Sequence, residues 1–72
     1  SGREELVGAT GTVESIDAAA VWVRVHGEAW QARPATANNE LAVGDRVRVS
    51  GLDGLTLIVR PLGQQESRNN GR

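Results

Sequence analysis

The chain contains no cysteine, phenylalanine, tyrosine, methionine or lysine among its 72 residues. Without cysteine there is no disulfide framework, and the thiolate ligands of a structural zinc site are missing as well. Trp22 and Trp30 are therefore the only aromatic side chains of the phenylalanine, tyrosine and tryptophan class. A domain of this size buries little surface, so its stability must come from a compact core of valine, leucine and alanine.

The chain also lacks a surplus of charge and any long apolar run. Its eight basic residues, all arginine, oppose nine aspartates and glutamates, which leaves a net charge of −1. Nucleic-acid binding usually depends on a basic surplus that releases counterions from phosphates, so the composition argues against it, although a local basic patch remains open. The longest apolar run, residues 18–23, is far shorter than the roughly 18 residues that cross a bilayer.

The two ends of the chain are polar and aperiodic, which predicts a single domain between two tails. We expect disordered tails over residues 1–5 and 63–72 and a β-barrel domain over residues 6–62. No signal peptide opens the chain, and Ser1-Gly2 looks like a remnant of cloning an excised domain. We therefore expect membrane-spanning segments of the parent protein to lie outside this sequence, and the domain itself to be soluble.

Short runs of alternating apolar and polar residues, separated by glycine-bearing turns, predict an all-β fold. The expected strands cover residues 7–16, 20–25, 28–33 and 46–50, with a fifth after Gly54. Gly8 and Gly11 interrupt the first strand, which predicts tight coiling or a bulge there. Five such strands favour a five-stranded, OB-like small β-barrel, open or closed.

The bend at His26-Gly27 sorts the side chains of the two strands around it. If these residues form a two-residue hairpin loop, the opposed pairs are Val25 with Glu28, Val23 with Trp30 and Val21 with Ala32. Directly opposed residues share a face of the sheet, so Trp30 joins the valines in the core, where its indole N–H needs an acceptor. The outer face then carries Trp22, Arg24, Ala29, Gln31 and Arg33.

The last hairpin admits two registers. A two-residue Asp53-Gly54 loop would pair Val49 with Ile58 and turn the following leucines away from the valines. A three-residue loop, 52–54, instead pairs Val49 with Leu57 and Val47 with Val59, and it places Gly54 where a left-handed residue is favoured. We choose the three-residue loop because it unites the apolar positions. In the connection before this hairpin, residues 35–43, we expect Leu41 and Val43 to tuck under the barrel.

No constellation of catalytic or metal-binding residues stands out. His26 is the only histidine and lies at a predicted turn, so a solvated turn residue is a better interpretation than a metal ligand. The serines do not lie in a nucleophile elbow, no pair of carboxylates is suited to acid–base catalysis, and no helix follows the glycine pairs to make a phosphate loop. We therefore expect no enzymatic activity, no metal and no cofactor.

Trp22 is the side chain for which two interpretations compete. It is either a half-covered tryptophan shielded by arginine stems, or an exposed anchor for a partner, because tryptophan and arginine dominate interface hot spots. The predicted outer face places it beside Gln31, with arginines on both strands. The candidate partner-binding residues are Trp22, Arg24, Gln31 and Arg33.

Four motifs follow one another along the predicted body: Gly8-x-x-Gly11-x-Val13, Val23-x-Val25-x-Gly27-Glu28-x-Trp30-x-Ala32, Leu41-x-x-Gly44-x-x-Val47-x-Val49 and Gly54-Leu55-x-Leu57-x-Val59-x-Pro61. This order resembles the C-terminal soluble domain of NfeD-type membrane proteins. The resemblance implies an OB-type barrel attached to transmembrane helices, and a scaffold role for the matching Gly27, Glu28, Trp30, Gly44 and Gly54. It brings no catalytic residue, and the ClpP-like protease domain of some members is missing here.

The resemblance also implies a partner: a stomatin-, flotillin- or prohibitin-like membrane protein, in membrane organisation or membrane-protein quality control. We expect a non-catalytic adaptor that docks on this partner, or on another copy of itself, in a membrane-associated and preferably cytoplasmic setting. The alternative is an OB-type single-stranded nucleic-acid-binding domain, which would use the same face through stacking and positive charge. We expect no nucleic acid because the chain is slightly acidic.

Overall fold

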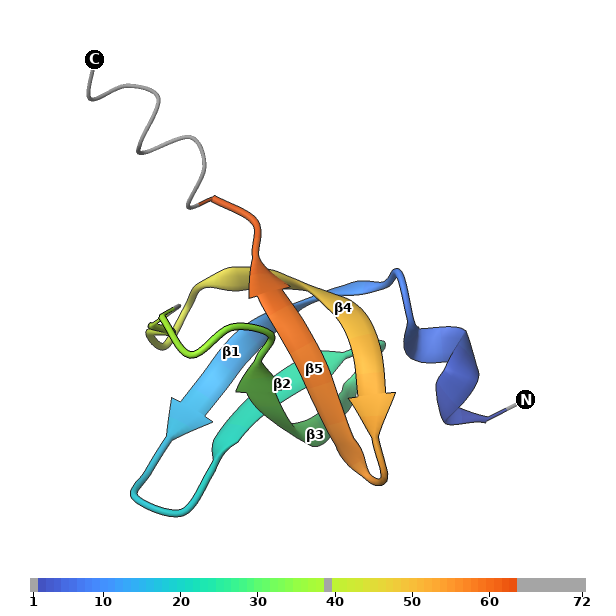
Figure 1. Ribbon diagram of the computed structural model, residues 1–72, viewed down its shortest axis with the longest axis horizontal. Helices are drawn as coiled ribbons and strands as arrows, with labels where there is room; N and C mark the ends of the chain where they lie inside the picture. Colours follow the sequence, from blue (N-terminus) through green and yellow to red (C-terminus); the bar gives the residue numbers. More distant parts are fainter. Residues whose placement is uncertain (1, 39, 64–72) are drawn as a thin grey trace.

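Five strands close into a barrel in which the neighbours follow the order β1-β2-β3-β5-β4 (Figure 1). The structure, a computed structural model, describes residues 2–38 and 40–63. Its elements are a 3-10 helix η1 (Arg3–Leu6) and the strands β1 (Thr10–Ile16), β2 (Val21–Val25), β3 (Glu28–Pro34), β4 (Arg46–Asp53) and β5 (Thr56–Pro61). The predicted all-β class and five-stranded OB-like barrel are confirmed.

Closure depends on two pairings between segments that are distant in the sequence. β1 pairs antiparallel with β4, where Gly11 lies opposite Val47. β3 and β5 run parallel, from Ala32 opposite Leu57 to Pro34 opposite Val59. Parallel neighbours cannot be joined by a tight hairpin, so the chain leaves β3 and forms β4 before it returns as β5.

The β2–β3 hairpin has the register that the sequence predicts. Val25 lies opposite Glu28, Val23 opposite Trp30 and Val21 opposite Ala32. His26 and Gly27 are the two loop residues, with φ of 52° and 81°. Two positive φ angles in a two-residue loop are typical of a type I′ turn, whose twist matches that of the strands.

The β4–β5 register differs from the prediction by two residues. Val49 lies opposite Val59 and Val47 opposite Pro61, and the register shifts between Val49 and Gly51. The loop is Gly54-Leu55, with Gly54 at a φ of 61°, as in a type II′ turn with glycine first. The bulge shifts the alternation of β4 by one residue, so Val47 and Val49 share the inner face with Leu57 and Val59.

The core is made of the inward-facing residues of all five strands. Among the described residues, seven large side chains are fully buried: Val13, Val23, Val25, Val47, Val49, Leu57 and Val59. Leu6 and Ala32 complete the buried set, and Trp30 and Leu41 pack against it. Val43 was expected to join this core, but it is 63% exposed. It lies in the turn that precedes β4, next to Gly44, and its side chain does not reach the barrel interior.

Two features of the N-terminal half differ from the expectation. Residues Arg3–Leu6, at the end of the predicted tail, form η1. The bulge in β1 lies between Val13 and Ser15 and not at Gly8 or Gly11. The division into domain and tails stays a prediction, and residues 64–72 lie outside the described residues.

Candidate functional site

The four candidate partner-binding residues lie on the outward side of β2 and β3, which we call the β2–β3 outer face (Trp22, Arg24, Gln31 and Arg33). Trp22 lies directly opposite Gln31 in the ladder. Arg24 and Arg33 are two residues further along their strands, in opposite directions. The structure therefore brings all four onto one surface, as the hairpin predicts.

Trp22 is half-buried rather than exposed, whereas Gln31, Arg24 and Arg33 are exposed. Trp30, across the sheet, packs against the core. The parity of the His26-Gly27 turn thus separates the two indoles as predicted, but less of the Trp22 ring is accessible than the alternating pattern indicates.

Both arginines of this face are paired with carboxylates of the same chain. The Arg24 guanidinium donates from Nε and Nη2 to Glu14 Oε2 at 3.3 and 3.0 Å, and from Nη1 to the Gly27 carbonyl at 2.9 Å. Arg33 Nη1 lies 2.8 Å from Asp53 Oδ2. These exposed pairs contribute little stability, but they neutralise the positive charge that the sequence places on this face.

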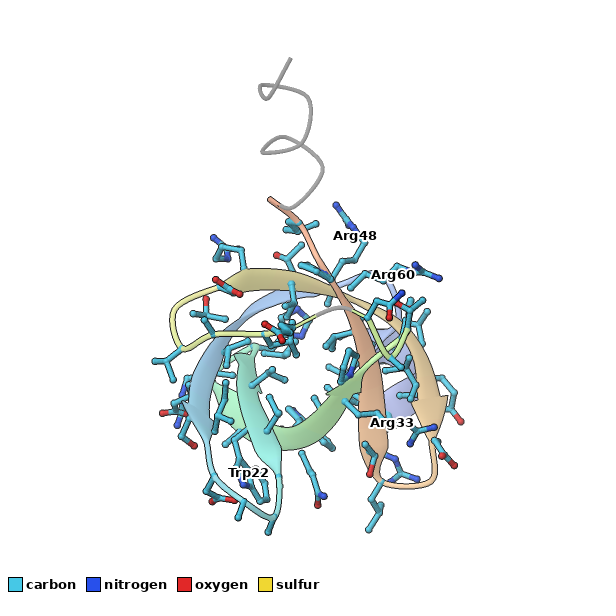
Figure 2. All side chains as sticks on the ribbon, turned by 60° about the vertical axis from the view of Figure 1, so that its left-hand side comes forward. Trp22, Arg33, Arg48 and Arg60 are labelled. Carbon is cyan, nitrogen blue, oxygen red and sulfur yellow. The ribbon has the colours of Figure 1, made fainter. Side chains whose placement is uncertain are left out.

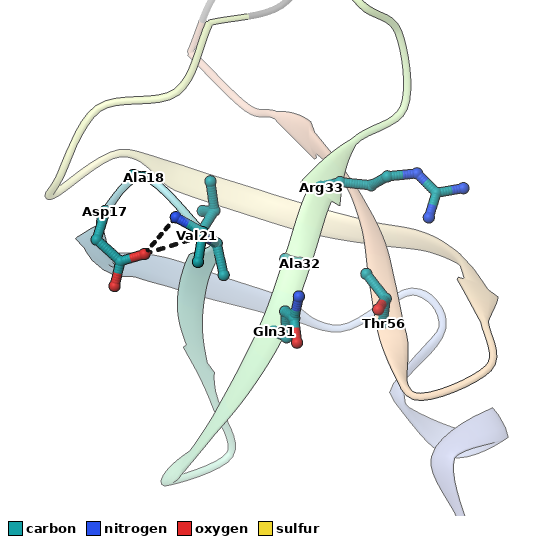
Figure 3. A pocket seen from close by; sticks show the side chains of 9 residues that line it. Asp17, Ala18, Val21, Gln31, Ala32, Arg33 and Thr56 are labelled. Atoms are coloured by element: carbon teal, nitrogen blue, oxygen red, sulfur yellow. Dashed lines mark hydrogen bonds between the residues drawn. The ribbon is translucent and has the colours of Figure 1, made fainter.

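An open hollow of about 400 Å³ borders the same surface (Figure 3). It is lined by Gln31, Ala32 and Arg33 of β3. Thr56 of β5 lies on one side of these residues, and the β1–β2 loop, residues 17–20, lies on the other. The loop is shaped by Asp17, whose Oδ1 accepts hydrogen bonds from the backbone N–H groups of Ala19 and Ala20, both at 2.9 Å. Such local side-chain bonds hold a tight turn in one conformation.

A second hollow, of about 430 Å³, lies between η1 and the β2–β3 turn. Leu6, His26, Glu28 and Trp30 line it together with residues from the start of the chain. The indole Nε1 of Trp30 is buried and has no acceptor among the described residues. The sequence predicts an acceptor for the Trp30 N–H, and residues 2–38 and 40–63 do not supply one.

The remaining motif residues serve the turns of the barrel. Gly27 and Glu28 belong to the β2–β3 turn, and Gly54 to the β4–β5 turn. Gly44 has a φ of 95° and donates its N–H to the Val13 carbonyl at 2.8 Å, which anchors the start of β4 beside β1. Side chains other than glycine rarely adopt this backbone conformation.

Within residues 2–38 and 40–63, no three histidine, cysteine or carboxylate side chains are grouped as metal ligands, and His26 is exposed at its turn. Helical structure in the same residues is too short and too polar to cross a membrane.

Sequence reasoning missed the residues that shape this face from other elements. Glu14 of β1 reaches Arg24 on the adjacent strand β2. Asp53 and Thr56 come from the β4–β5 hairpin, and their approach to β3 depends on the pairing of β3 with β5. Asp17 could have been found, because an aspartate before a short connection is a common turn former.

The similarity to known proteins agrees with this picture. The sequence model of the family described as "NfeD-like C-terminal, partner-binding domain" matches residues 3–61. The "Membrane-bound protease PH1510" of Pyrococcus horikoshii is 43% identical over 60 residues. This match covers 82% of the chain but only 13% of that protein.

Two solved structures share both the fold and the sequence pattern. The C-terminal domain of stomatin operon partner protein 1510-C from Pyrococcus horikoshii has a TM-score of 0.73 at 40% identity, covering 86% of this chain and 95% of that one. The soluble domain of a membrane protein implicated in regulation of membrane protease activity, from Corynebacterium glutamicum, has a TM-score of 0.72 at 32% identity, covering 81% and 94%. The chain therefore belongs to the family of NfeD-like C-terminal, partner-binding domains.

Proposed function

We propose that this domain is a non-catalytic adaptor of a membrane-anchored NfeD-like protein and that it docks a stomatin-, flotillin- or prohibitin-like membrane protein on its β2–β3 outer face. The solved relative from Pyrococcus horikoshii is described as a stomatin operon partner, and that from Corynebacterium glutamicum as implicated in regulating membrane protease activity. Both descriptions favour a role in membrane organisation or membrane-protein quality control. The barrel is proposed to lie on the cytoplasmic side.

The observation that carries the proposed surface is the pairing of Trp22 with Gln31, which itself lines the hollow of Figure 3. A large, half-buried aromatic ring next to an exposed amide combines apolar area with hydrogen-bonding groups. Such a ring is already partly ordered, so binding immobilises little additional side-chain freedom. Residues of this kind are typical anchors of protein interfaces.

Trp22→Ala should weaken binding to a purified stomatin-type protein about tenfold or more, because a central tryptophan is a typical hot spot. Binding is measured by titration calorimetry below the melting temperature of the variant, which we expect to fall modestly because the ring is half-buried. Val43→Ala is the matched control, since Val43 is exposed and lies outside this face. Equal affinity of the two variants would exclude the face, and no binding by the wild-type domain would exclude the partner class.

The alternative, binding of single-stranded nucleic acid, is less favoured by the geometry. OB barrels bind such strands with aromatic stacking and a positive groove. Here Arg24 and Arg33 are paired with Glu14 and Asp53. Strong, salt-sensitive quenching of tryptophan fluorescence by an oligonucleotide would revive this alternative.

A further inference from the structure

Three arginines lie on a different part of the barrel from the β2–β3 outer face. Arg46 and Arg48 are exposed on β4, and Arg60 is exposed on β5. Arg48 and Arg60 are directly opposite each other in the β4–β5 ladder. Figure 2 shows these two side chains well away from Trp22. We call these three residues the arginine stripe.

The arginine stripe has no carboxylate partner within residues 2–38 and 40–63. The ion pairs found there, of Arg24 with Glu14 and of Arg33 with Asp53, belong to the other face. The Arg60 side chain makes no hydrogen bond or ion pair with any described residue. In a chain with a net charge of −1, this is a local concentration of uncompensated positive charge.

Two of the three guanidinium groups are held in place by neutral acceptors. Arg46 donates from Nε to the Gly11 carbonyl at 3.2 Å and from Nη2 to Thr10 Oγ1 at 3.3 Å. Arg48 donates from Nη1 to the Gly8 carbonyl at 2.9 Å. A guanidinium has five N–H donors, so both groups keep donors for a further acceptor. Their positions are thus prepared before any partner arrives, which lowers the entropic cost of binding.

The arrangement is unfavourable for the isolated barrel. Like charges directly opposite in a sheet destabilise it, and Arg48 and Arg60 occupy such positions. An anionic partner would relieve this repulsion and fill the free donors with paired hydrogen bonds, the geometry in which arginine binds carboxylate most strongly.

We propose that the arginine stripe is a docking site for an extended acidic segment of a protein partner, with carboxylates at alternate residues. Arg46 and Arg48 are two residues apart on one strand, so their Cα atoms are about 7 Å apart. Alternate side chains of an extended peptide have the same spacing and point the same way. Three arginines are few for an anionic membrane, where recognition typically uses clusters of four to eight basic residues.

The probe is a short fluorescein-labelled peptide in which glutamate alternates with threonine, and its anisotropy is followed as the domain is added. Arg60→Gln should weaken binding about fivefold or more, because it removes a charged donor group. The same variant should melt about 1–5 °C higher, because it removes the opposed like charges. Arg3→Gln is the charge-matched control; it changes an exposed arginine on η1 and should leave affinity near that of the wild type.

Each alternative has its own outcome. If Arg60→Gln and Arg3→Gln lowered the affinity for the peptide equally, only the net charge of the domain would matter, and the proposed site would be wrong. Equal affinity for an isomeric peptide with consecutive glutamates would overturn the alternate spacing. Binding to phosphatidylserine vesicles but not to the peptide would assign the stripe to a membrane. A dimer in sedimentation that Arg60→Gln dissociates would assign it to a second copy of this chain. None of these outcomes depends on Trp22 or on the stomatin-type partner.

Discussion

His26 is held in a left-handed backbone conformation that side chains rarely adopt. Its φ is 52°, and the following Gly27 has a φ of 81°. The type I′ turn requires both angles to be positive, and asparagine followed by glycine is the favoured pair. Histidine is one of the few non-glycine residues that adopt a positive φ with some frequency, and the turn sets the register of β2 against β3. The length of this turn thus keeps Trp22 and Trp30 on opposite faces of the sheet.

His26→Asn should therefore stabilise the domain, by about 0.5–1 kcal/mol, since asparagine adopts this conformation more readily. Gly27→Ala in the same turn should act in the opposite direction, because alanine at a positive φ is strained. Chemical denaturation of both variants measures the difference. A loss of stability in His26→Asn would show that the imidazole makes a contribution beyond the turn.

At the scale of the elements, Gly11 allows β1 to lie close to β2. A Cβ atom at Gly11 would lie 2.4 Å from the Arg24 carbonyl oxygen and 2.7 Å from Val25 Cγ2. Real Cβ contacts do not reach such distances, and a carbonyl oxygen in a ladder cannot move away freely. The glycine that was predicted to mark a bulge instead permits a close contact between strands.

Gly11→Ala should destabilise the barrel by about 1–3 kcal/mol, the usual cost of forcing extra volume into a packed site. Gly51→Ala is the matched control, because a Cβ there would meet Ile58 Cβ at an ordinary 3.9 Å. We expect the control to stay within about 0.5 kcal/mol of the wild type. Equal melting temperatures for Gly11→Ala and Gly51→Ala would contradict the close contact of β1 with β2.

At the scale of the whole molecule, the barrel needs a side chain from outside its strands to complete the core. Leu6, the last residue of η1, is 7% exposed and belongs to the buried cluster. It lies with Trp30 near the β2–β3 turn. Because a chain this short buries little apolar surface, one additional leucine is a substantial part of its core.

Leu6→Ala should lower the free energy of unfolding by about 2 kcal/mol or more, as for other buried leucines. Val7→Ala, one residue further, changes a side chain that is 47% exposed and should have an effect below about 0.5 kcal/mol. Denaturant unfolding measures both. If the two variants were equally stable, η1 would not be part of the folded domain.

The β2–β3 hairpin was predicted in every pair because its information is local. Two-residue alternation assigns the faces, and a two-residue turn decides which residues are opposite. The same local information gives the core valines and the outward position of Trp22. The family resemblance rests on local information as well, because the glycines of its motif lie at tight turns formed by neighbouring residues.

The sequence by itself thus determined the strands, the inward and outward faces and the family, because alternation and turn chemistry act over a few neighbouring residues. Only the tertiary structure decided the β4–β5 register, where the Gly54-Leu55 turn and a bulge together place Arg60 opposite Arg48 rather than opposite Arg46 as the predicted register would. It also decided which arginines are neutralised, since Glu14 reaches Arg24 across β1–β2 and Asp53 reaches Arg33 only after β3 and β5 pair. The Arg33–Asp53 contact joins distant segments, so it depends on how the whole barrel closes, and the Glu14–Arg24 contact depends on the bulged register of β1 against β2.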